Sequence, residues 1–281
     1  MIIATQSFGL KKEFEADLTG TIRRLHDMGF QGIEPFILFQ KEQGKMARNT
    51  WAQDTLKTAW HTMQELGMVI PSAHIGVGFG WATMPAGTVI QNILKLHEEY
   101  GIESFVLSAP FGSAPLARRW AKLAKKVSDA VKSHGCRIIY HNHDDEFHSV
   151  RSGRTAMDVF LKNAGEDVLL QIDIGWAGMA GDEREIVGRY PERVFSLHLK
   201  DFYAKYRGNY TRKNMPDEAF APIGEGAITT KEIIRQAKAF PKFSGALIID
   251  QDRSSGDMMN DLKIGVKNIQ NMVNEIEEKP V

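Results

Sequence analysis

The sequence of 281 residues contains one cysteine and no excess charge of either sign. Cys136 alone cannot form an intrachain disulfide, which favours a reducing, cytoplasmic compartment. Lysine plus arginine and aspartate plus glutamate each number 35, so the formal net charge is zero. Proteins that bind nucleic acid usually carry a basic excess because phosphate contacts supply much of their affinity. Nucleic acid is therefore not an expected partner.

Long apolar runs and segments of biased composition are also absent from the sequence. No apolar stretch approaches the roughly 18 residues needed to cross a bilayer, and no basic segment followed by an apolar one begins the chain. We therefore expect neither a signal peptide nor a membrane partner. No proline-rich or low-complexity linker divides the sequence, which predicts one domain over residues 1–281.

Short apolar runs rich in β-formers recur along the whole chain. Eight of them occupy residues 2–6, 32–36, 68–74, 104–108, 137–141, 168–173, 194–198 and 246–250. Amphipathic segments separate them, for example 51–66, 117–133 and 257–278. Nearly continuous apolar runs are typical of parallel strands that are buried on both faces. Eight alternating strand and helix units predict an α/β fold, a closed (β/α)₈ TIM barrel. No glycine-rich nucleotide-binding motif follows any run, which argues against a doubly wound sheet.

Helix boundaries are marked by glycine and by one capping pattern. Gly29, Gly67, Gly101 and Gly135 each stand shortly before a strand-like run, where a left-handed glycine commonly ends a helix. The pattern Thr229-x-x-Glu232 predicts a capping box at the start of the helix that precedes the last strand.

Acids and imidazoles stand at the ends of six of the eight predicted strands. They are Glu34, His74, the segment 141–143, Asp173, His198 and Asp250. The active sites of α/β barrels lie at the carboxyl ends of the strands. Two imidazoles and two carboxylates from neighbouring strands can bind one divalent ion, so we predict that His141, Asp173, His198 and Asp250 are metal ligands. Their mixed nitrogen and oxygen donors favour Mn²⁺ first, with Zn²⁺, Co²⁺ or Mg²⁺ as alternatives.

Several further residues near the strand ends are candidates for substrate contact or packing. Glu34 and His74 either contact a substrate or cap the helices that follow them. Trp176 and Trp81 either form walls of a pocket or pack in the core. Arg253 either binds substrate or is a solvated surface residue.

Residues 201–223 form a segment that is long for a loop between a strand and a helix. It carries three tyrosines and four basic residues, which suit the faces and the acidic groups of a carbohydrate. A lid or substrate wall is one interpretation, and a solvated loop or an oligomer contact is the other.

Seven motifs, taken in order, resemble those of a known family. They are Gly-Phe-Gln-Gly-Ile-Glu (29–34), Ser-Ala-His (72–74), Tyr-His-Asn-His-Asp-Asp-Glu-Phe (140–147), Asp-Ile-Gly-Trp (173–176), His-Leu-Lys-Asp (198–201), Gly-Glu-Gly (224–226) and Asp-Gln-Asp (250–252). The set resembles the xylose isomerase-like TIM barrels, the sugar phosphate isomerase/epimerase superfamily. The resemblance implies metal ligands on strands five to eight, normally Glu, Asp, His and Glu. Asp173 and His198 match this pattern, whereas His141 and Asp250 replace the two glutamates.

The two replacements bear on the chemistry that the resemblance implies. Ketose 3-epimerases of this superfamily use the strand-five and strand-eight glutamates as paired proton-transfer groups. Glu146 could supply a carboxylate on the strand-five side, or could be the ligand, with His141 or His143 behind it. Lys200 could act as a general acid or base, because a nearby metal ion would lower its pKa; alternatively, it forms a salt bridge with Asp201. Glu146, Lys200 and His143 are the catalytic candidates.

These observations lead to one leading functional hypothesis and two alternatives. The first is a metal-dependent isomerase or epimerase that transfers a proton next to the carbonyl of a small keto-sugar or polyol. The second is a lyase or dehydratase of a keto-inositol or a 3-keto-glycoside. The third is a non-catalytic barrel that binds sugar or serves as a partner subunit. The resemblance also implies a homo-oligomer.

Overall fold

The computed structural model describes residues 1–38, 51, 53–79, 82–151 and 153–278. Its main sheet has the strand order β2-β1-β15-β12-β11-β8-β7-β4-β3. The two outer members, β2 (Gly32–Glu34) and β3 (Phe36–Leu38), are consecutive in the chain and are separated only by Pro35. They are two segments of one barrel strand, interrupted where proline lacks the N–H that a sheet ladder needs. Nine segments therefore fill eight positions, and the predicted α/β barrel is confirmed.

The other barrel strands follow the predicted runs closely. They are β1 (Ile2–Gln6), β4 (Ala73–Gly76), β7 (Ser104–Ser108), β8 (Arg137–His141), β11 (Leu169–Asp173), β12 (Val194–Leu199) and β15 (Ala246–Ile249). All pairings between neighbours in this sheet are parallel. The run 68–74 was predicted as a strand, but β4 begins only at Ala73. Val69 forms an isolated bridge to Gly32. Pro71 interrupts the ladder between Val69 and Ala73, where β4 begins.

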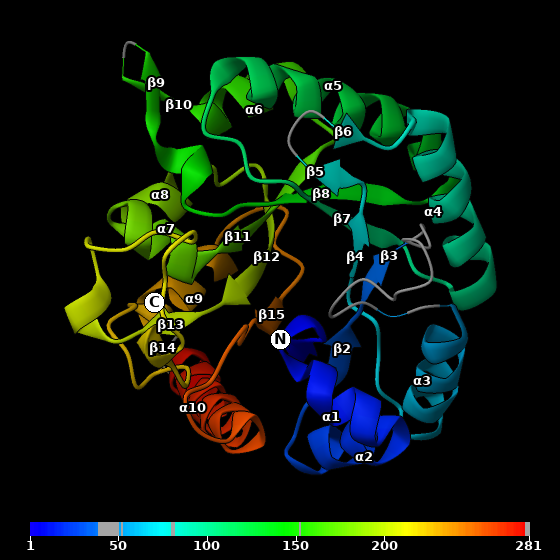
Figure 1. Cartoon of the computed structure of the whole chain (residues 1–281), viewed down its shortest axis with the longest axis vertical. Helices are drawn as coiled ribbons and strands as arrows, with labels where there is room; N and C mark the ends of the chain where they lie inside the picture. Colours follow the sequence, from blue (N-terminus) through cyan, green and yellow to red (C-terminus); the bar gives the residue numbers. More distant parts are fainter. Residues whose placement is uncertain (39–50, 52, 80–81, 152, 279–281) are drawn as a thin grey trace.

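Helices surround the strands (Figure 1). They are α1 (Lys11–Ala16), α2 (Leu18–Asp27), α3 (Gln53–Glu65), α4 (Ala86–Tyr100), α5 (Ala114–Val131), α6 (Ala156–Ala164), α7 (Ile174–Ala180), α8 (Glu183–Gly188), α9 (Thr230–Lys238) and α10 (Met258–Glu278). Short 3₁₀ helices lie at Phe8–Leu10, Lys132–His134, Asp145–Phe147, Ala204–Tyr206 and Asp217–Ala219. Two hairpins, β5 (Gly78–Phe79) with β6 (Ala82–Thr83) and β9 (Ser149–Arg151) with β10 (Arg154–Thr155), extend from loops. None of the helices described has the length and apolarity needed to span a membrane.

The predicted helix ends are confirmed and the predicted capping box is wrong. Gly29, Gly67, Gly101 and Gly135 all have positive φ, between 67° and 102°. At the start of α9, the Thr229 side chain makes no capping hydrogen bond to its own helix. It donates instead to Glu183 Oε1 of α8 at 2.8 Å, and the Thr229 N–H donates to the same oxygen at 3.0 Å. A buried carboxylate is a stronger acceptor than the groups within α9, and it joins the two helices.

The two ends of the long segment after β12 are folded against the barrel, and much of the stretch 203–218 between them is exposed. β13 (Asp201–Phe202) pairs antiparallel with β14 (Phe220–Ala221), and Phe202, Phe220 and Met215 form one buried apolar cluster with Trp176 of α7. The return of the chain is held by the Asp201 carboxylate, which accepts hydrogen bonds from the N–H groups of residues 224, 226 and 228 at 3.0–3.1 Å. A Cβ at Gly226 would lie 2.1 Å from Asp201 Oδ1, so only glycine permits this approach. The segment is therefore a wall of the barrel mouth.

Candidate active site

The inner face of the barrel changes from apolar to polar along each strand. Val106, Ile139 and Leu169 form an apolar cluster inside it. Side chains two positions apart on a strand point to the same face. His141 therefore points into the barrel as Ile139 does, and residues 171 and 173 point into it as Leu169 does. The polar residues at the strand ends are thereby turned inward, as the sequence predicts for a barrel site.

The four residues predicted as metal ligands are brought together at these strand ends. His141 of β8, Asp173 of β11, His198 of β12 and Asp250 after β15 each offer a ligand atom, and these atoms lie within 4.8 Å of one another. All four residues are buried. A second set, His74, His141 and His198, meets the same distance limit. The two sets share the imidazoles of His141 and His198, so both place an ion at the same end of the barrel.

Two buried atoms that make no hydrogen bond mark where a cation would fit, although one of them, Asp173 Oδ2, already lies 3.4 Å from the Lys200 ammonium. Nδ1 of His141 and Oδ2 of Asp173 are buried, and neither has a hydrogen-bond partner among the described residues. A buried polar atom without a partner costs free energy that a bound cation would offset. Burial, reinforced by the neighbouring imidazoles, holds the pKa of His141 well below its ordinary value, so this ring is neutral, as a metal ligand must be. Burial also raises the pKa of Asp173 to about 7, although Lys200 opposes the shift.

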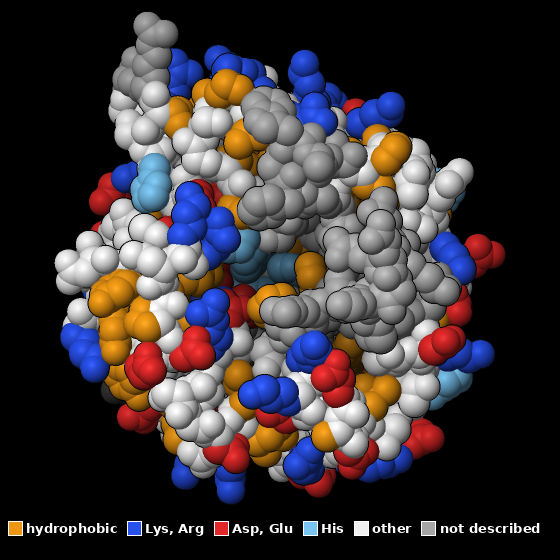
Figure 2. Space-filling view, viewed as in Figure 1, with side chains coloured by type: hydrophobic (Ala, Val, Ile, Leu, Met, Phe, Trp, Pro, Cys, Tyr) orange, Lys and Arg blue, Asp and Glu red, His pale blue; other side chains and the backbone are white. Residues whose placement is uncertain are grey.

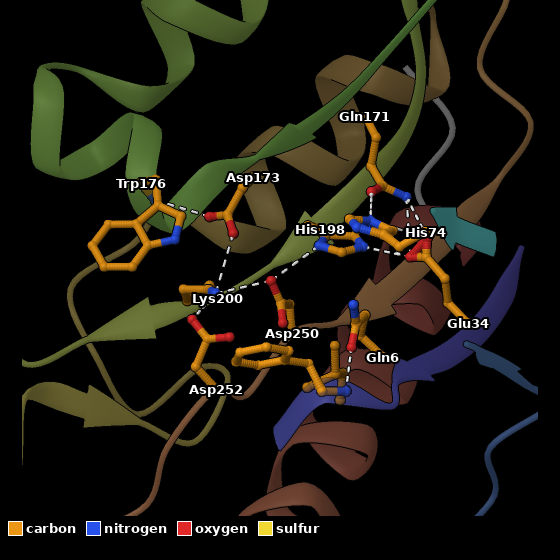
Figure 3. A network of polar contacts seen from close by, with 12 residues as sticks. Gln6, Glu34, His74, Gln171, Asp173, Trp176, His198, Lys200, Asp250 and Asp252 are labelled. Atoms are coloured by element: carbon orange, nitrogen blue, oxygen red, sulfur yellow. Dashed lines mark hydrogen bonds and ion pairs between the residues drawn. The ribbon is translucent and has the colours of Figure 1, made fainter. Parts of the chain in front are cut away.

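Lys200 connects the carboxylates beside this cluster (Figure 3). Its Nζ donates to Asp250 Oδ2 at 2.8 Å and to Asp252 Oδ2 at 2.6 Å, and it lies 3.4 Å from Asp173 Oδ2. The amine also lies 5.3 Å from the centre of the Trp176 ring. These three carboxylates outweigh burial and raise the pKa of Lys200 above its ordinary value.

Lys200 forms ion pairs, but not with Asp201, the neighbouring acid that the sequence suggested, because Asp201 holds the chain return after β14. The lowered pKa was predicted for Lys200 beside a bound metal ion, whereas the raised pKa given above is that of the metal-free protein. Lys200 lies beside the proposed ligands, as predicted, but it is a fixed, buried cation. The backbone of Lys200 is also closely packed against α7, because a Cβ at Gly175 would lie 2.7 Å from the Lys200 carbonyl oxygen.

His198 lies between two carboxylates. Its Nδ1 is 3.1 Å from Asp250 Oδ2, and its Nε2 is 2.6 Å from Glu34 Oε2. Burial alone would lower the pKa of His198, but Glu34 and Asp250 outweigh it and raise the pKa to about 10. Burial would raise the pKa of Asp250, yet Lys200 and His198 hold it well below its ordinary value. Asp252, Lys200, Asp250, His198 and Glu34 thus form a chain of alternating charge across the barrel end (Figure 3).

A cavity of about 270 Å³ opens above this cluster. Its lining comprises Gln6, Phe8, Phe36, His74, Ser108, His141, His143, Trp176, Arg212, Met215, Phe220, Asp250, Asp252 and Arg253. In Figure 2 a hollow near the middle of the visible face has histidine side chains at its floor. His74, Trp176 and Arg253, which were predicted to contact substrate, therefore line one cavity with the catalytic candidate His143. Trp81 lies outside the described residues.

Five predicted site residues are absent from the cavity lining: Asp173, His198, Lys200, Glu34 and Glu146. Glu34 is fully buried beneath it, and its oxygens are engaged by other side chains, so the substrate contact expected from the sequence is not what the geometry provides. Glu146 turns toward the outer side of β8. It accepts hydrogen bonds from Tyr140 Oη at 2.6 Å and from the N–H groups of His143 and Phe111 at 2.9 and 3.2 Å. Burial raises the pKa of Glu146 to about 7. This glutamate holds the turn that carries His143, and it is not among the clustered ligands.

Some site residues were not singled out from the sequence. Gln171 stands two positions before Asp173, so strand alternation alone would have placed it in the barrel interior. Arg212, by contrast, was predicted as one of the basic residues of the long segment after β12, and its Nη2 donates to Asp145 Oδ2 at 3.1 Å. Ser72 entered only as part of the Ser-Ala-His motif (72–74), and Gln6 ends a strand without a charged group.

A closed α/β barrel with its titratable side chains gathered at the carboxyl ends of the strands is the architecture of a barrel enzyme. The chain belongs to the xylose isomerase-like TIM barrel family, whose family model matches residues 22–272. Members of this family typically are enzymes, among them isomerases and epimerases that act on small sugars. No curated protein sequence matches the chain.

Solved structures of low sequence identity share the fold. A sugar phosphate isomerase/epimerase from Parabacteroides distasonis is 19% identical, with 96% of this chain and 95% of that chain covered and a TM-score of 0.72. A probable 3-DHS dehydratase of petrobactin synthesis from Bacillus anthracis is 12% identical, with coverages of 96% and 99% and a TM-score of 0.71. The IOLI protein with a bound zinc atom is 13% identical, with coverages of 98% and 99% and a TM-score of 0.67.

Proposed function

We propose that the protein is a divalent-metal-dependent isomerase or epimerase that moves a proton next to the carbonyl of a small keto-sugar or polyol. The observation that carries the proposal is the convergence of His141, Asp173, His198 and Asp250, of which His141 and Asp250 line the cavity. His141 Nδ1 and Asp173 Oδ2 are buried and make no hydrogen bond among the described residues, although Lys200 Nζ lies 3.4 Å from the aspartate oxygen. Membership of the family supports sugar as the substrate class.

The four clustered side chains would hold the ion, and Mn²⁺ is the ion that we expect first. When bound, such an ion polarises a carbonyl oxygen and stabilises the enediolate formed when the neighbouring carbon loses its proton. The zinc atom in the related IOLI structure supports a divalent ion as the class of cofactor. We also propose that the protein is a homo-oligomer and that it works in a reducing, cytoplasmic compartment. Light scattering of the purified protein tests its oligomeric state.

The cavity walls suit a carbohydrate with an acidic substituent. Trp176, Phe36 and Phe220 offer apolar faces to the C–H side of a sugar. Arg212 and Arg253 line the same cavity. Arg212 bonds Asp145 through one guanidinium nitrogen, and Arg253 bonds Met215 and Asp217 through one, so each retains other guanidinium nitrogens as donors for a substrate. The arginines suit a phosphate or carboxylate group on the substrate.

His143 is the side chain that we assign to proton transfer. It lines the cavity, and its Nδ1 is buried without a partner among the described residues. Burial, with Arg212 and Lys200, lowers the pKa of His143 to about 3, so in the metal-free protein the imidazole is neutral and is a weak base. Lys200 cannot take this role in the arrangement described, because its amine is held by carboxylates and does not line the cavity.

Replacing His143 with Gln is expected to lower kcat about 10²- to 10⁴-fold, the usual contribution of a positioned acid or base. Metal content should remain that of the wild type, because His143 is not among the clustered ligands. Steady-state kinetics and elemental analysis measure the two quantities. Exposed His134 provides the matched control, and His134→Gln should leave both unchanged. A His143→Gln enzyme with wild-type kcat would remove His143 from the mechanism.

Metal affinity is expected to weaken as the pH falls. In the metal-free protein Asp173 has a pKa of about 7 and His198 a pKa of about 10, so both carry protons below pH 7 that a bound ion must displace. Between pH 7 and 10 only His198 releases a proton, which predicts about tenfold weaker binding per pH unit lost. Below pH 7 the dependence should steepen because Asp173 adds a second proton. Mn²⁺ titrations from pH 6 to 9 measure this slope, and a constant Kd would contradict it.

A lyase is the second candidate, and the orientation of Glu146 favours it. A two-carboxylate epimerase needs acids on both sides of the substrate, yet Glu146 turns away from the cavity to Tyr140. Among the described residues, the lining carboxylates Asp250 and Asp252 both follow β15, while the β8 side offers His141 and His143. One imidazole that removes a proton and returns it to a leaving group suffices for an elimination. An unsaturated product absorbing in the ultraviolet would identify this outcome.

The metal-replete protein in D₂O, with a panel of ketoses, keto-inositols and 3-keto-glycosides, tests the proposal. We expect loss of the proton signal at the carbon next to the carbonyl for at least one compound, as seen by ¹H NMR. If no compound exchanges that proton, the proposed chemistry is wrong. Binding of a sugar without any exchange or product would favour the non-catalytic barrel.

A further inference from the structure

We propose that Glu34 is a positioning residue that holds His198 with Nδ1 directed at the metal site and with the proton on Nε2. This inference rests on the proposed function insofar as that function includes a bound divalent ion. It assigns Glu34 a role that differs from substrate contact, because the side chain is fully buried and lies outside the described cavity lining.

The contact between Glu34 and His198 fixes which ring nitrogen faces which way. Oε2 of Glu34 lies 2.6 Å from Nε2, while Oδ2 of Asp250, itself a proposed ligand, lies 3.1 Å from Nδ1 (Figure 3). An ionised carboxylate only accepts hydrogen bonds, so in the metal-free protein both ring nitrogens donate, Nε2 to Glu34 and Nδ1 to Asp250. Because Asp250 is itself a proposed ligand, an ion on its side would displace the Nδ1 proton and leave the Nε2 proton on Glu34. Metal-bound histidines commonly donate their second N–H to a carboxylate in this way.

Glu34 is itself held in place by neutral donors from two other strands. Ser72 Oγ donates to Oε1 at 2.9 Å, and Gln171 Nε2 donates to Oε1 and Oε2 at 3.0 and 3.3 Å. Gln171 Oε1 lies 2.8 Å from His74 Nε2, which closes the network around the barrel interior. His74 and His198 outweigh burial and keep the pKa of Glu34 below its ordinary value. The carboxylate therefore has a fixed orientation, which a group that orients another side chain needs.

The same contacts decide between the two possible ligand sets. In the set of His74, His141 and His198, Nε2 of His198 is already held by Glu34, and Nε2 of His74 faces Gln171. In the set with Asp173 and Asp250, Nδ1 of His141 and Oδ2 of Asp173 make no hydrogen bond among the described residues, although Lys200 Nζ lies 3.4 Å from the aspartate oxygen, and His198 presents Nδ1. Glu34 thus directs the ion toward the carboxylate side of His198.

The test compares Glu34→Gln with Glu183→Gln. Both replace a buried glutamate with its amide, but Glu183 contacts Thr229 and Arg207, far from the proposed ligands in the network. Titration with Mn²⁺ alone should give a Kd about 10- to 100-fold weaker for Glu34→Gln than for wild type, the usual loss on removing such a carboxylate. Glu183→Gln should keep the wild-type Kd. The visible spectrum of bound Co²⁺ should change in Glu34→Gln only. Equal Kd values for Glu34→Gln and wild type would overturn the inference.

An NMR measurement on the wild-type protein tests the role of Glu34 even if Glu34→Gln fails to fold. Long-range ¹H–¹⁵N NMR of the Zn²⁺-loaded protein reports which nitrogen of His198 carries the proton. The inference predicts a protonated Nε2 and a metal-bound Nδ1, and a metal-bound Nε2 would overturn it. If the wild type binds no divalent ion, the proposed function fails and this inference with it. If the wild type binds the ion through Nε2, only the role of Glu34 is wrong.

Discussion

Replacing Asp173 with Asn is expected to lower the rate of α-proton exchange by about 10³-fold, because metal stabilisation of the developing charge is worth several kcal/mol and each 1.36 kcal/mol is tenfold. The amide preserves the shape of the side chain. Its oxygen can still accept the hydrogen bond from the Trp176 N–H, which Asp173 Oδ1 accepts at 2.8 Å at the start of α7. The fold should therefore survive while the anionic ligand is lost.

Elemental analysis and proton exchange, measured on the same samples, check this prediction. Asp173→Asn should contain much less bound Mn²⁺ than the wild type after dialysis. Glu183→Gln, which also converts a buried acid to an amide, should keep both metal and exchange. Full exchange by an Asp173→Asn protein with an unchanged melting temperature would show that Asp173 is not a metal ligand.

Replacing Lys200 with Met is expected to destabilise the metal-free protein by about 3–5 kcal/mol, the cost of removing one partner from a buried ion pair. The substitution leaves Asp250 and Asp252 without the ammonium that lies 2.8 and 2.6 Å from them. Asp173, whose Oδ2 lies 3.4 Å from the same nitrogen, loses its nearest cation. Methionine fills a similar volume, so little of the loss should come from a cavity.

Urea unfolding in the presence of a chelator measures this free energy. Addition of Mn²⁺ should recover part of the loss in Lys200→Met, since the ion supplies positive charge to the same carboxylates. Lys132 is the matched control: it pairs with Asp167 at 2.8 Å, but both side chains are more than half exposed. Lys132→Met should cost about 1 kcal/mol or less. A similarly small cost for Lys200→Met would show that the buried cation is dispensable.

The barrel could be predicted from the sequence because its strands are buried on both faces. Runs such as Ser104–Ser108 and Arg137–His141 are continuous in apolar or β-forming residues, and both match the structure at each end. The run 68–74 was misjudged because composition does not show that Pro71 breaks the ladder before Ala73. The capping pattern at Thr229 failed for a related reason: a tertiary contact with Glu183 replaced the local hydrogen bond.

The ligand positions could be predicted because strand ends meet at one rim, whatever the details of the loops. Asp173 and His198 are register partners on adjacent parallel strands, so the alternation of side chains along the strands brings them together. The direction of Glu146 could not be predicted, because the turn after β8 decides whether that carboxylate faces the cavity or Tyr140. The contact of Glu34 with His198 joins residues 164 positions apart, and no local pattern specifies it.

The central claim is that a divalent ion held by His141, Asp173, His198 and Asp250 makes this site active. The most direct test strips the purified protein with a chelator and then titrates it with Mn²⁺, following bound metal and α-proton exchange of an accepted keto-sugar in the same samples. The account predicts that the stripped protein is inactive, and that exchange rises in proportion to bound Mn²⁺ until each chain holds a single ion. Undiminished exchange in the stripped protein, or saturation with Mn²⁺ that restores no exchange, would contradict it.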